Sequence, residues 1–199
     1  MDIDFTDLFI AFVMGAIILL YIRSYYGEVA FVTSEKDGRR YLVRKLSDRQ
    51  EAADMLARLN EKLTVLVQHV KAGASSGVKG ATGVSPNEAA RLYENYDPEA
   101  LSEGGTEIGY TSYSVNKGEK IVMCLRHKDN TFVDENVLMY VAVHELGHLM
   151  TDEIGHTDLF WSNFRALLQD AIGLGLYTKV DFAASPESYC GIKITSSVV

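Results

Sequence analysis

The sequence predicts an α+β protein: a small, mostly antiparallel sheet packed on several helices, preceded by one membrane-spanning helix. Three observations lead to this fold class. An uncharged apolar segment lies near the N-terminus. Behind it, short segments with strand-like alternation are interspersed with longer segments of helical apolar spacing. One apolar helical segment contains two histidines and a glutamate within five residues. The chain of 199 residues is long enough for one domain with a buried core.

The N-terminal apolar segment is predicted to cross a lipid bilayer. Leu8–Ile22 has 15 residues without a charge, and residues 5–26 reach about 33 Å as a helix, enough for a hydrocarbon core of about 30 Å. Its apolar residues cover all faces, unlike those of a surface helix. A signal peptide would begin with basic residues, whereas three aspartates precede this segment and no A-x-A cleavage site follows. We therefore expect residues 1–26 to be an N-terminal anchor.

The charges that flank the anchor predict its orientation. No Lys or Arg precedes the span, whereas Arg23 and three more basic residues follow it by Arg40. The positive-inside rule then places the N-terminus outside and residues 27–199 on the cytosolic side, or on the equivalent side of a virion membrane. Two cysteines, Cys124 and Cys190, are too few for a disulfide framework and fit a reducing compartment. A single disulfide between them is the alternative. We expect both to be small buried residues.

Residues 27–199 begin with a predicted hairpin and a long helix. Glu28–Thr33 and Arg39–Lys45 are typical of strands around a turn that contains Asp37-Gly38. A capping box of Ser47 and Gln50 then predicts a helix that ends at Gly73. Its spacing predicts one buried stripe, made of Ala52, Leu56, Leu59, Leu63, Leu66 and Val70.

The middle of the chain is predicted to be less regular. The Gly- and Ser-rich residues 73–83 indicate a flexible loop within the domain. Ser85-Pro86-Asn87-Glu88 is typical of a capped helix start, and this helix should end near Asn95. The acidic residues within 94–107 are expected to form a solvated face. Tyr110–Asn116 and Glu119–Leu125 alternate like the two strands of a hairpin.

The last third of the chain predicts two helices. The first runs from about Asp134 to Asp152 and is broken by Gly155; the second is capped by Thr157 and runs from Asp158 to about Ile172. Residues 177–199 indicate loop and short strand. In the second helix, the spacing of Phe160, Trp161, Phe164, Leu167 and Leu168 favours core packing over substrate binding.

The motif His144-Glu-Leu-Gly-His148 lies inside the first of these helices. Histidines four residues apart share one helix face, so both imidazoles can bind one zinc ion. Glu145, beside the first ligand, is placed to take a proton from water that the metal activates. Three such polar groups would be costly in so apolar a helix without a partner. The pattern therefore predicts a zinc site of the HExxH type.

A third ligand is needed to complete such a site. His156 is the leading candidate, because a turn at Gly155 can fold the chain back towards the metal. Carboxylate alternatives are Asp152, Glu153, Asp158 and the more distant Glu187. A tyrosine could also stabilise an oxyanion, although each candidate is more simply a packing residue. The candidates are Tyr110, Tyr113, Tyr177 and Tyr189.

Residues 121–168 resemble the core of the WLM and SprT-like zinc metalloproteases. The resemblance covers about a quarter of the chain. It implies a minimal zincin-like fold, zinc bound by His144, His148 and His156, and Glu145 as general base in peptide-bond hydrolysis. The matching features are Leu125-Arg126 at the end of a strand, Phe132, the motif 144–148, His156, Asp158 and Phe160-Trp161.

The chain departs from that family in three ways. The gap between His148 and His156 is two residues longer than usual. Basic or ubiquitin-binding tails, which direct WLM proteins to protein crosslinked to DNA, are not seen, and an anchor is unusual. An anchor followed by such a domain is more similar to zinc-peptidase-like membrane proteins of large DNA viruses, which implies neighbouring membrane or capsid proteins as partners.

We therefore expect a single-pass, zinc-dependent metallopeptidase that acts on a protein or peptide substrate. The alternative is a non-catalytic structural or adaptor membrane protein, such as a minor capsid or inner-membrane component of a large DNA virus, in which zinc only stabilises the fold. A net charge of −8 and the absence of a large basic cluster argue against nucleic acid as a partner. A DNA-crosslink protease is accordingly disfavoured.

Overall fold

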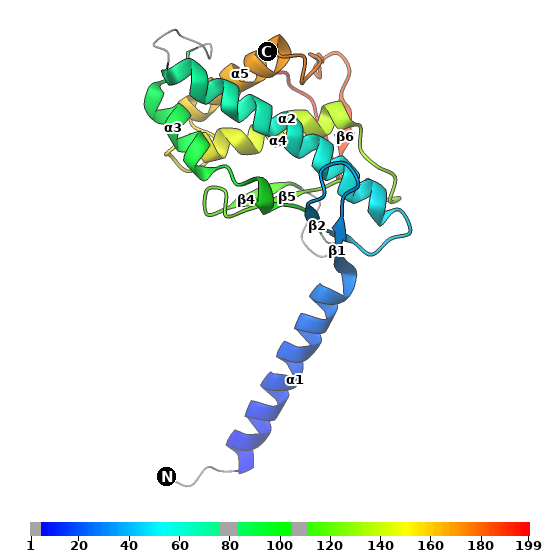
Figure 1. Cartoon of the computed structure of the whole chain (residues 1–199). Coiled ribbons are helices and arrows are strands. Elements are labelled where there is room, and N and C mark those ends of the chain that lie inside the picture. Colours follow the sequence, from blue (N-terminus) through cyan, green and yellow to red (C-terminus); the bar gives the residue numbers. More distant parts are fainter. Residues whose placement is uncertain (1–4, 76–82, 105–110) are drawn as a thin grey trace.

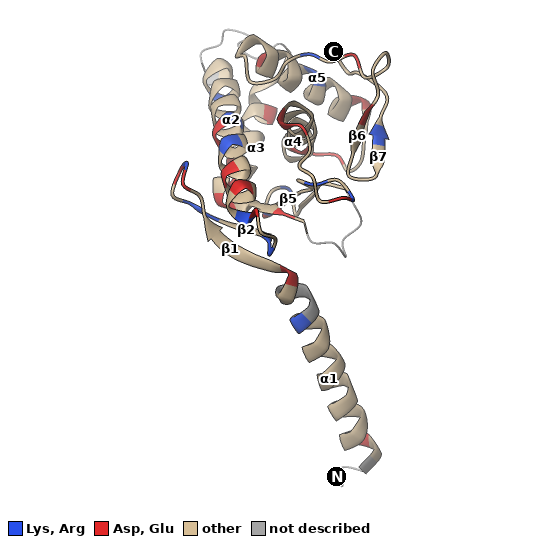
Figure 2. Cartoon of the chain, turned by 90° about the vertical axis from the view of Figure 1, so that its right-hand side faces the viewer, with Lys and Arg blue, Asp and Glu red and all other residues tan. Residues whose placement is uncertain are grey.

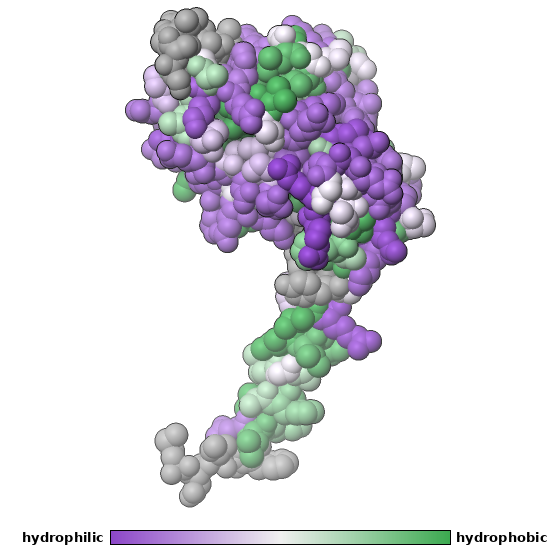
Figure 3. All heavy atoms as spheres, viewed as in Figure 1, coloured by the Kyte–Doolittle hydropathy of each residue, from purple (hydrophilic) through white to green (hydrophobic). Residues whose placement is uncertain are grey.

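The computed structural model describes residues 5–75, 83–104 and 111–199 and has an α+β fold (Figure 1). Helix α1 (Phe5–Glu28) projects away from the folded domain, and its window Thr6–Arg23 has a mean hydropathy of 1.9 with none of it buried. Figure 2 shows charged residues of α1 only near its two ends, and Figure 3 shows its apolar surface. The helix is long and apolar enough to span a membrane or to act as a signal sequence.

The main sheet is mixed, so the expectation of a mostly antiparallel sheet was wrong. Its order is β1-β2-β3-β5-β4. The outer pairs β1–β2 and β4–β5 are antiparallel hairpins, as their turn residues predict, but β3 is parallel to both β2 and β5. The helices between β2 and β3 form the crossover that a parallel pair requires. The strands are β1 (Val29–Thr33), β2 (Arg40–Arg44), β3 (Leu101–Glu103), β4 (Tyr113–Val115) and β5 (Lys120–Met123).

Four helices pack together on one side of this sheet and enclose the core (Figure 1). All six residues of the apolar stripe predicted for α2 are buried, and this helix packs on β1, β2 and β3 of the sheet and on α3, α4 and α5. A short 3-10 helix (Pro98–Ala100) leads into β3. The helices are α2 (Arg49–Ser75), α3 (Pro86–Asn95), α4 (Glu135–Met150) and α5 (Asp158–Gly173).

The helix ends follow local sequence signals with one exception. The capping box of Ser85 and Glu88 is present, and Asp134 and Thr157 cap α4 and α5. The predicted box of Ser47 and Gln50 was wrong. Ser47 lies in a turn before α2, and the Gln50 side chain instead donates to the backbone oxygen of Thr33 in β1. Residues 73–75 of the expected loop are helical, and residues 76–82 lie outside the described part.

A disulfide joins Cys124 to Cys190, which corrects the expectation of two reduced cysteines. Cys124 follows β5, and Cys190 lies in the turn between β6 (Glu187–Tyr189) and β7 (Ile192–Ile194), a separate two-stranded sheet. The two residues are 66 positions apart, so local sequence carries no sign of their contact. Disulfides persist mainly in oxidising compartments. Cysteine usage therefore no longer supports a cytosolic orientation.

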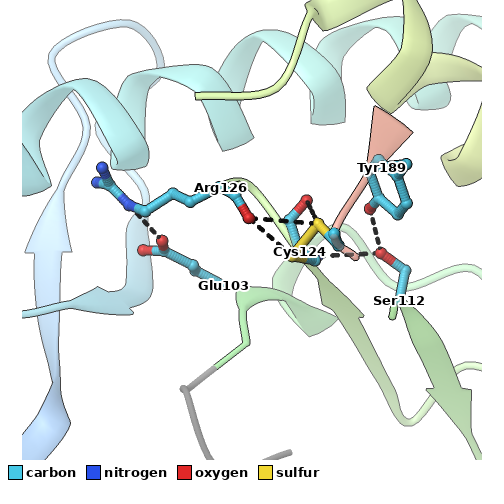
Figure 4. Close-up of a disulfide and its surroundings, with 6 residues drawn as sticks. Glu103, Ser112, Cys124, Arg126 and Tyr189 are labelled. Atoms are coloured by element: carbon cyan, nitrogen blue, oxygen red, sulfur yellow. Dashed lines mark hydrogen bonds and ion pairs between the residues drawn. A yellow bond between two sulfur atoms is a disulfide. The ribbon is translucent and has the colours of Figure 1, made fainter. Parts of the chain in front are cut away.

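The acidic segment 94–107 is not wholly solvated, which corrects a second expectation. Glu103 in β3 is buried and accepts a hydrogen bond of 2.8 Å at Oε1 from Nε of buried Arg126 (Figure 4). Asp48 pairs with another guanidinium nitrogen of Arg126 at 2.7 Å. A buried carboxylate needs such a partner. The ion pair therefore ties β3 to the segment after β5; residues 105–107 lie outside the described part.

Candidate metal centre

Helix α4 places two histidines, His144 and His148, on one of its faces. The Nε2 atoms of His144 and His148 are 3.2 Å apart. Both residues are half-buried, whereas most of α4 is fully buried. This arrangement follows from the i, i+4 spacing, since positions one turn apart lie on the same helix face. The two rings thus direct their nitrogen atoms to one point.

His156 reaches the same point from the loop between α4 and α5. Its Nε2 lies 3.0 Å from Nε2 of His144. The helix ends at Met150, and Gly155 has φ of 87°, a backbone conformation that favours glycine. Among the described residues, three histidines and no carboxylate form this group, which could hold a metal ion. The alternatives Asp152, Glu153, Asp158 and Glu187 are therefore not brought to it.

The spacing and the donor type of the three histidines fit a zinc ion. A tetrahedral zinc with Zn–N bonds of about 2.0–2.1 Å places neighbouring ligand nitrogens about 3.3 Å apart. The observed separations from His144 are 3.0 and 3.2 Å. Burial and the neighbouring histidines lower the pKa of His144 to about 3, and burial, His156 and Lys117 lower the pKa of His148 to about 4. Both rings are therefore neutral at pH 7, as a metal ligand must be.

Aromatic side chains of α5 support the histidine rings from behind. Phe160 stacks on His148 with ring centroids 4.3 Å apart, and Phe164 meets His144 edge-on at 5.2 Å. Both phenylalanines are fully buried, as the helical spacing predicts, whereas Trp161 is 39% exposed beside His156. Gly147 allows the close approach, since a Cβ atom there would lie 3.0 Å from Cε2 of Phe160. Packing therefore restricts the orientation of the three imidazoles.

Glu145 lies next to the cluster in a buried position. Burial raises the pKa of its carboxyl to about 7, and hydrogen bonds from the side chain and backbone of Ser114 act in the opposite direction. Ser114 belongs to β4, the edge strand of the sheet. A carboxyl whose pKa lies near neutrality can both accept and release a proton at pH 7. Glu145 thus has the protonation behaviour of a general acid–base group.

Lys117 is a site residue that the sequence reasoning missed. Its Nζ atom donates to the backbone oxygens of Thr151 at 2.6 Å and of Glu153 at 3.0 Å, at the C-terminal end of α4. Such a cation satisfies carbonyl groups that have no partner within the helix. The predicted hairpin requires only a turn between its strands here, and the turn is present: Asn116, Lys117 and Gly118 all have positive φ. Nothing in that pattern indicated that the lysine reaches the loop before His156.

The cluster opens into a cavity of about 570 Å³ between β4 and the loop that precedes α5. Of the tyrosines considered for an oxyanion, Tyr113 lines this cavity and Tyr189 lines a neighbouring one. Tyr177 instead packs against Tyr140, and Tyr110 lies outside the described residues. The cavity is lined by Ser112, Tyr113, Ser114, Asn116, Lys117, His144, Glu145, His148, Glu153, Ile154, Gly155 and His156.

Comparison with known proteins finds relatives in viruses. The "Uncharacterized protein R325" of Acanthamoeba polyphaga mimivirus is 30% identical over 187 residues, which cover 92% of this chain and 91% of the relative. The "Uncharacterized protein 136R" of Invertebrate iridescent virus 6 is 40% identical over 80 residues, 39% of this chain and 44% of that protein. The "Uncharacterized protein 042R" of Invertebrate iridescent virus 3 is 44% identical over 68 residues, 33% of this chain and 42% of that protein. No family model and no solved structure matches the chain.

Proposed function

The chain belongs to the family of the mimivirus protein R325, and we propose that it is a membrane-anchored, zinc-dependent metallopeptidase. The proposal is argued from the site, because the viral relatives are named only as uncharacterized proteins. The observation that carries it is the convergence of His144, His148 and His156 beside the buried carboxyl of Glu145. Three ligands with an adjacent acid–base group are the parts that metal-assisted hydrolysis needs.

The histidines would hold the metal and Glu145 would move the proton. Bound zinc would supply a Lewis acid that polarises the scissile carbonyl and acidifies water. Glu145 accepts a proton from the water whose oxygen attacks the carbonyl carbon. It then delivers that proton to the amine nitrogen as the C–N bond breaks. Its pKa of about 7 suits both transfers.

Two further observations support an enzyme over a structural zinc protein. A structural zinc site is normally closed by four protein ligands, whereas the described part of the chain brings three donors to this one. The group also faces a cavity large enough for a peptide segment. The competing function is a structural component of a virus particle whose fold is stabilised by zinc, and it would need a fourth protein ligand.

Two residues of the pattern that resembles the WLM and SprT-like proteases contact each other in the fold. Arg126 pairs with Phe132 in an isolated β-bridge, and its guanidinium carbon lies 4.1 Å from the centroid of the Phe132 ring. These two residues are part of the pattern that carries the resemblance. Their contact closes the loop before α4 and so supports the start of the helix that bears the motif. The zincin-like fold is accordingly part of the proposal.

Replacement of Glu145 by Gln tests the function directly. The full chain, purified in detergent and loaded with zinc, is incubated with a peptide library, and products are identified by mass spectrometry. We expect Glu145→Gln to keep its zinc and to lose cleavage by at least about 100-fold. Glu61→Gln, an exposed change on α2, is the matched control and should cleave like the wild type. Equal cleavage by Glu145→Gln would refute the mechanism, and no cleavage by zinc-loaded wild type would favour the structural role.

We further propose that residues 5–26 anchor the domain in a bilayer. The projecting, unburied α1 supports this over a core helix. The flanking charges favour a domain on the cytosolic side, whereas the Cys124–Cys190 disulfide is more typical of an oxidising compartment. Resistance to alkaline carbonate extraction tests the anchor. Digestion of residues 27–199 by protease added to the cytosolic face of sealed membranes tests the orientation, and protection from it would reverse the topology.

A further inference from the structure

A second cavity meets the metal centre from the side of the C-terminal hairpin. It has a volume of about 340 Å³, within the range of small ligand sites. Four residues border both this cavity and the one described above: Ser112, His144, Glu145 and His156. A peptide whose scissile bond lies at the cluster would therefore have access to both cavities.

The two cavities differ in chemical character. The cavity along β4 includes Asn116, Lys117 and Glu153. The cavity at the hairpin is bordered by apolar side chains from two elements, Tyr140 and Val141 of α4 and Ile192 and Ile194 of β7, and Tyr189 of β6 completes this lining. Ile192 is 49% exposed. This wall is suited to contact with an aliphatic group.

The hairpin that carries this wall, formed by β6 and β7, is held in place by a disulfide and by hydrogen bonds through Ser112. The Cys124–Cys190 disulfide joins its turn to the end of β5. The Tyr189 hydroxyl lies 2.5 Å from Oγ of Ser112, which also accepts a hydrogen bond from the Cys124 backbone nitrogen at 3.0 Å; Figure 4 shows these contacts around the bridge. Cys190 has φ of 46° in the turn, a conformation that costs a side-chain-bearing residue energy.

We propose that this disulfide-held hairpin is the specificity element of the enzyme: Ile192 and Ile194 form the wall of a pocket that binds a large aliphatic side chain of the substrate next to the scissile bond. The inference rests on the proposed peptidase function. Because the bridge and the Ser112–Tyr189 contact hold the wall beside Glu145 and His156, thiol–disulfide exchange with an external dithiol releases the wall. In this exchange the bridge becomes two thiols and the dithiol becomes a disulfide. The preference for an aliphatic side chain is then lost while the histidines stay in place.

A peptide series that differs at one position tests the pocket. Leu, Ala and Asp are compared at the residue on each side of the cleaved bond, and kcat/KM is measured with the zinc-loaded full chain. We expect Leu to be preferred over Asp by at least about 10-fold at one of the two positions. Ile192→Asp and the double variant Cys124→Ser/Cys190→Ser should both remove this preference. Val65→Asp, at an exposed apolar position of α2, should leave it unchanged.

The proposal is overturned if Ile192→Asp and the double serine variant both prefer Leu over Asp as strongly as the wild type does. The zinc content of each variant is also measured. If the double serine variant loses both its zinc and the preference for Leu, the hairpin does more than set specificity, and this counts against the proposal. Wild type that has been treated with a dithiol should show the same loss of preference for Leu as the double serine variant. Thiol labelling shows whether the bridge is fully reduced. If the fully reduced protein still prefers Leu over Asp, the claim that the bridge holds the pocket wall in place is overturned.

A binding experiment separates failure of this proposal from failure of the peptidase function. The full chain in nanodiscs, with methyl-labelled isoleucine, is titrated with N-acetyl-leucine amide and with N-acetyl-aspartate amide without any cleavage being required. Shifts of the Ile192 and Ile194 methyl signals with the leucine compound alone support the pocket even if no peptide is cleaved. Absence of these shifts would overturn the pocket even if the chain proves to be an active peptidase.

Discussion

The Nε2 atoms of His144 and His156 lie 3.0 Å apart, although a helix end, a turn and 12 positions of chain separate the two residues. Two neutral imidazoles can share only one proton between such nitrogens. Because Nε2 of His148 also lies 3.2 Å from Nε2 of His144, a single hydrogen bond cannot satisfy all three rings. A cation that accepts three lone pairs resolves this conflict, which is why the geometry favours a metal.

The buried carboxyl of Glu145 predicts a pH-dependent stability in the zinc-free protein. Its pKa rises from 4.5 to about 7 on folding, so its contribution is fully present below pH 4.5 and is lost as the pH rises through 7. Glu145→Gln removes this dependence. Relative to wild type, the variant should therefore gain on the order of 2–3 kcal/mol in free energy of unfolding between pH 4.5 and 8.

Urea unfolding of the zinc-free chain at these two pH values measures this difference. The lowered pKa values of His144 and His148 reduce stability as the pH falls below 6.5, but they do so in both proteins and cancel in the comparison. If the difference in free energy of unfolding between Glu145→Gln and wild type is the same at both pH values, the Glu145 carboxyl is not protonated in the folded protein.

Gly147→Ala should disturb the support of the histidines. The added methyl would lie 3.0 Å from Cε2 of Phe160, whose ring stacks on His148. Overpacking of this kind typically costs about 1–3 kcal/mol, and a displaced Phe160 should also weaken zinc affinity. Gly173→Ala near the end of α5 meets nothing within 4 Å and should be neutral or slightly stabilising. Melting temperatures and zinc titrations that are equal for the two variants would contradict this account.

Glu103→Ala should be among the most destabilising single changes in the sheet. It leaves Arg126, with 2% of its side chain exposed, without one of its carboxylate partners and also removes the acceptor of the Arg44 backbone N–H. Loss of one partner of a buried pair costs about 3–5 kcal/mol. Glu99→Ala breaks an exposed pair with Arg39 and should cost less than about 1 kcal/mol. Chemical denaturation of both variants checks the contrast, and similar losses would refute it.

Local patterns were sufficient for much of this fold. The stripe of α2, the caps of α3, α4 and α5 and the two tight turns each depend on residues a few positions apart, and each is present. The proximity of His144 and His148 belongs to the same class, because it follows from helical spacing alone.

Features that depend on distant residues were not predictable in this way. Strand β3 has three residues within an acidic segment, and its parallel placement depends on a crossover of two helices. Burial of Glu103 depends on Arg126, 23 positions later. The Cys124–Cys190 bridge and the reach of Lys117 to the loop after α4 likewise require the tertiary fold.

Metal analysis of the purified full chain tests the central claim most directly. Zinc is measured by elemental mass spectrometry in the wild type, in His148→Ala and in His127→Ala, a histidine outside the cluster. We expect about one zinc per chain in the wild type and in His127→Ala, and a loss of at least about 100-fold in affinity in His148→Ala. A well-folded wild type that binds no zinc, even after zinc is supplied in excess, would contradict the metal centre and the peptidase function with it.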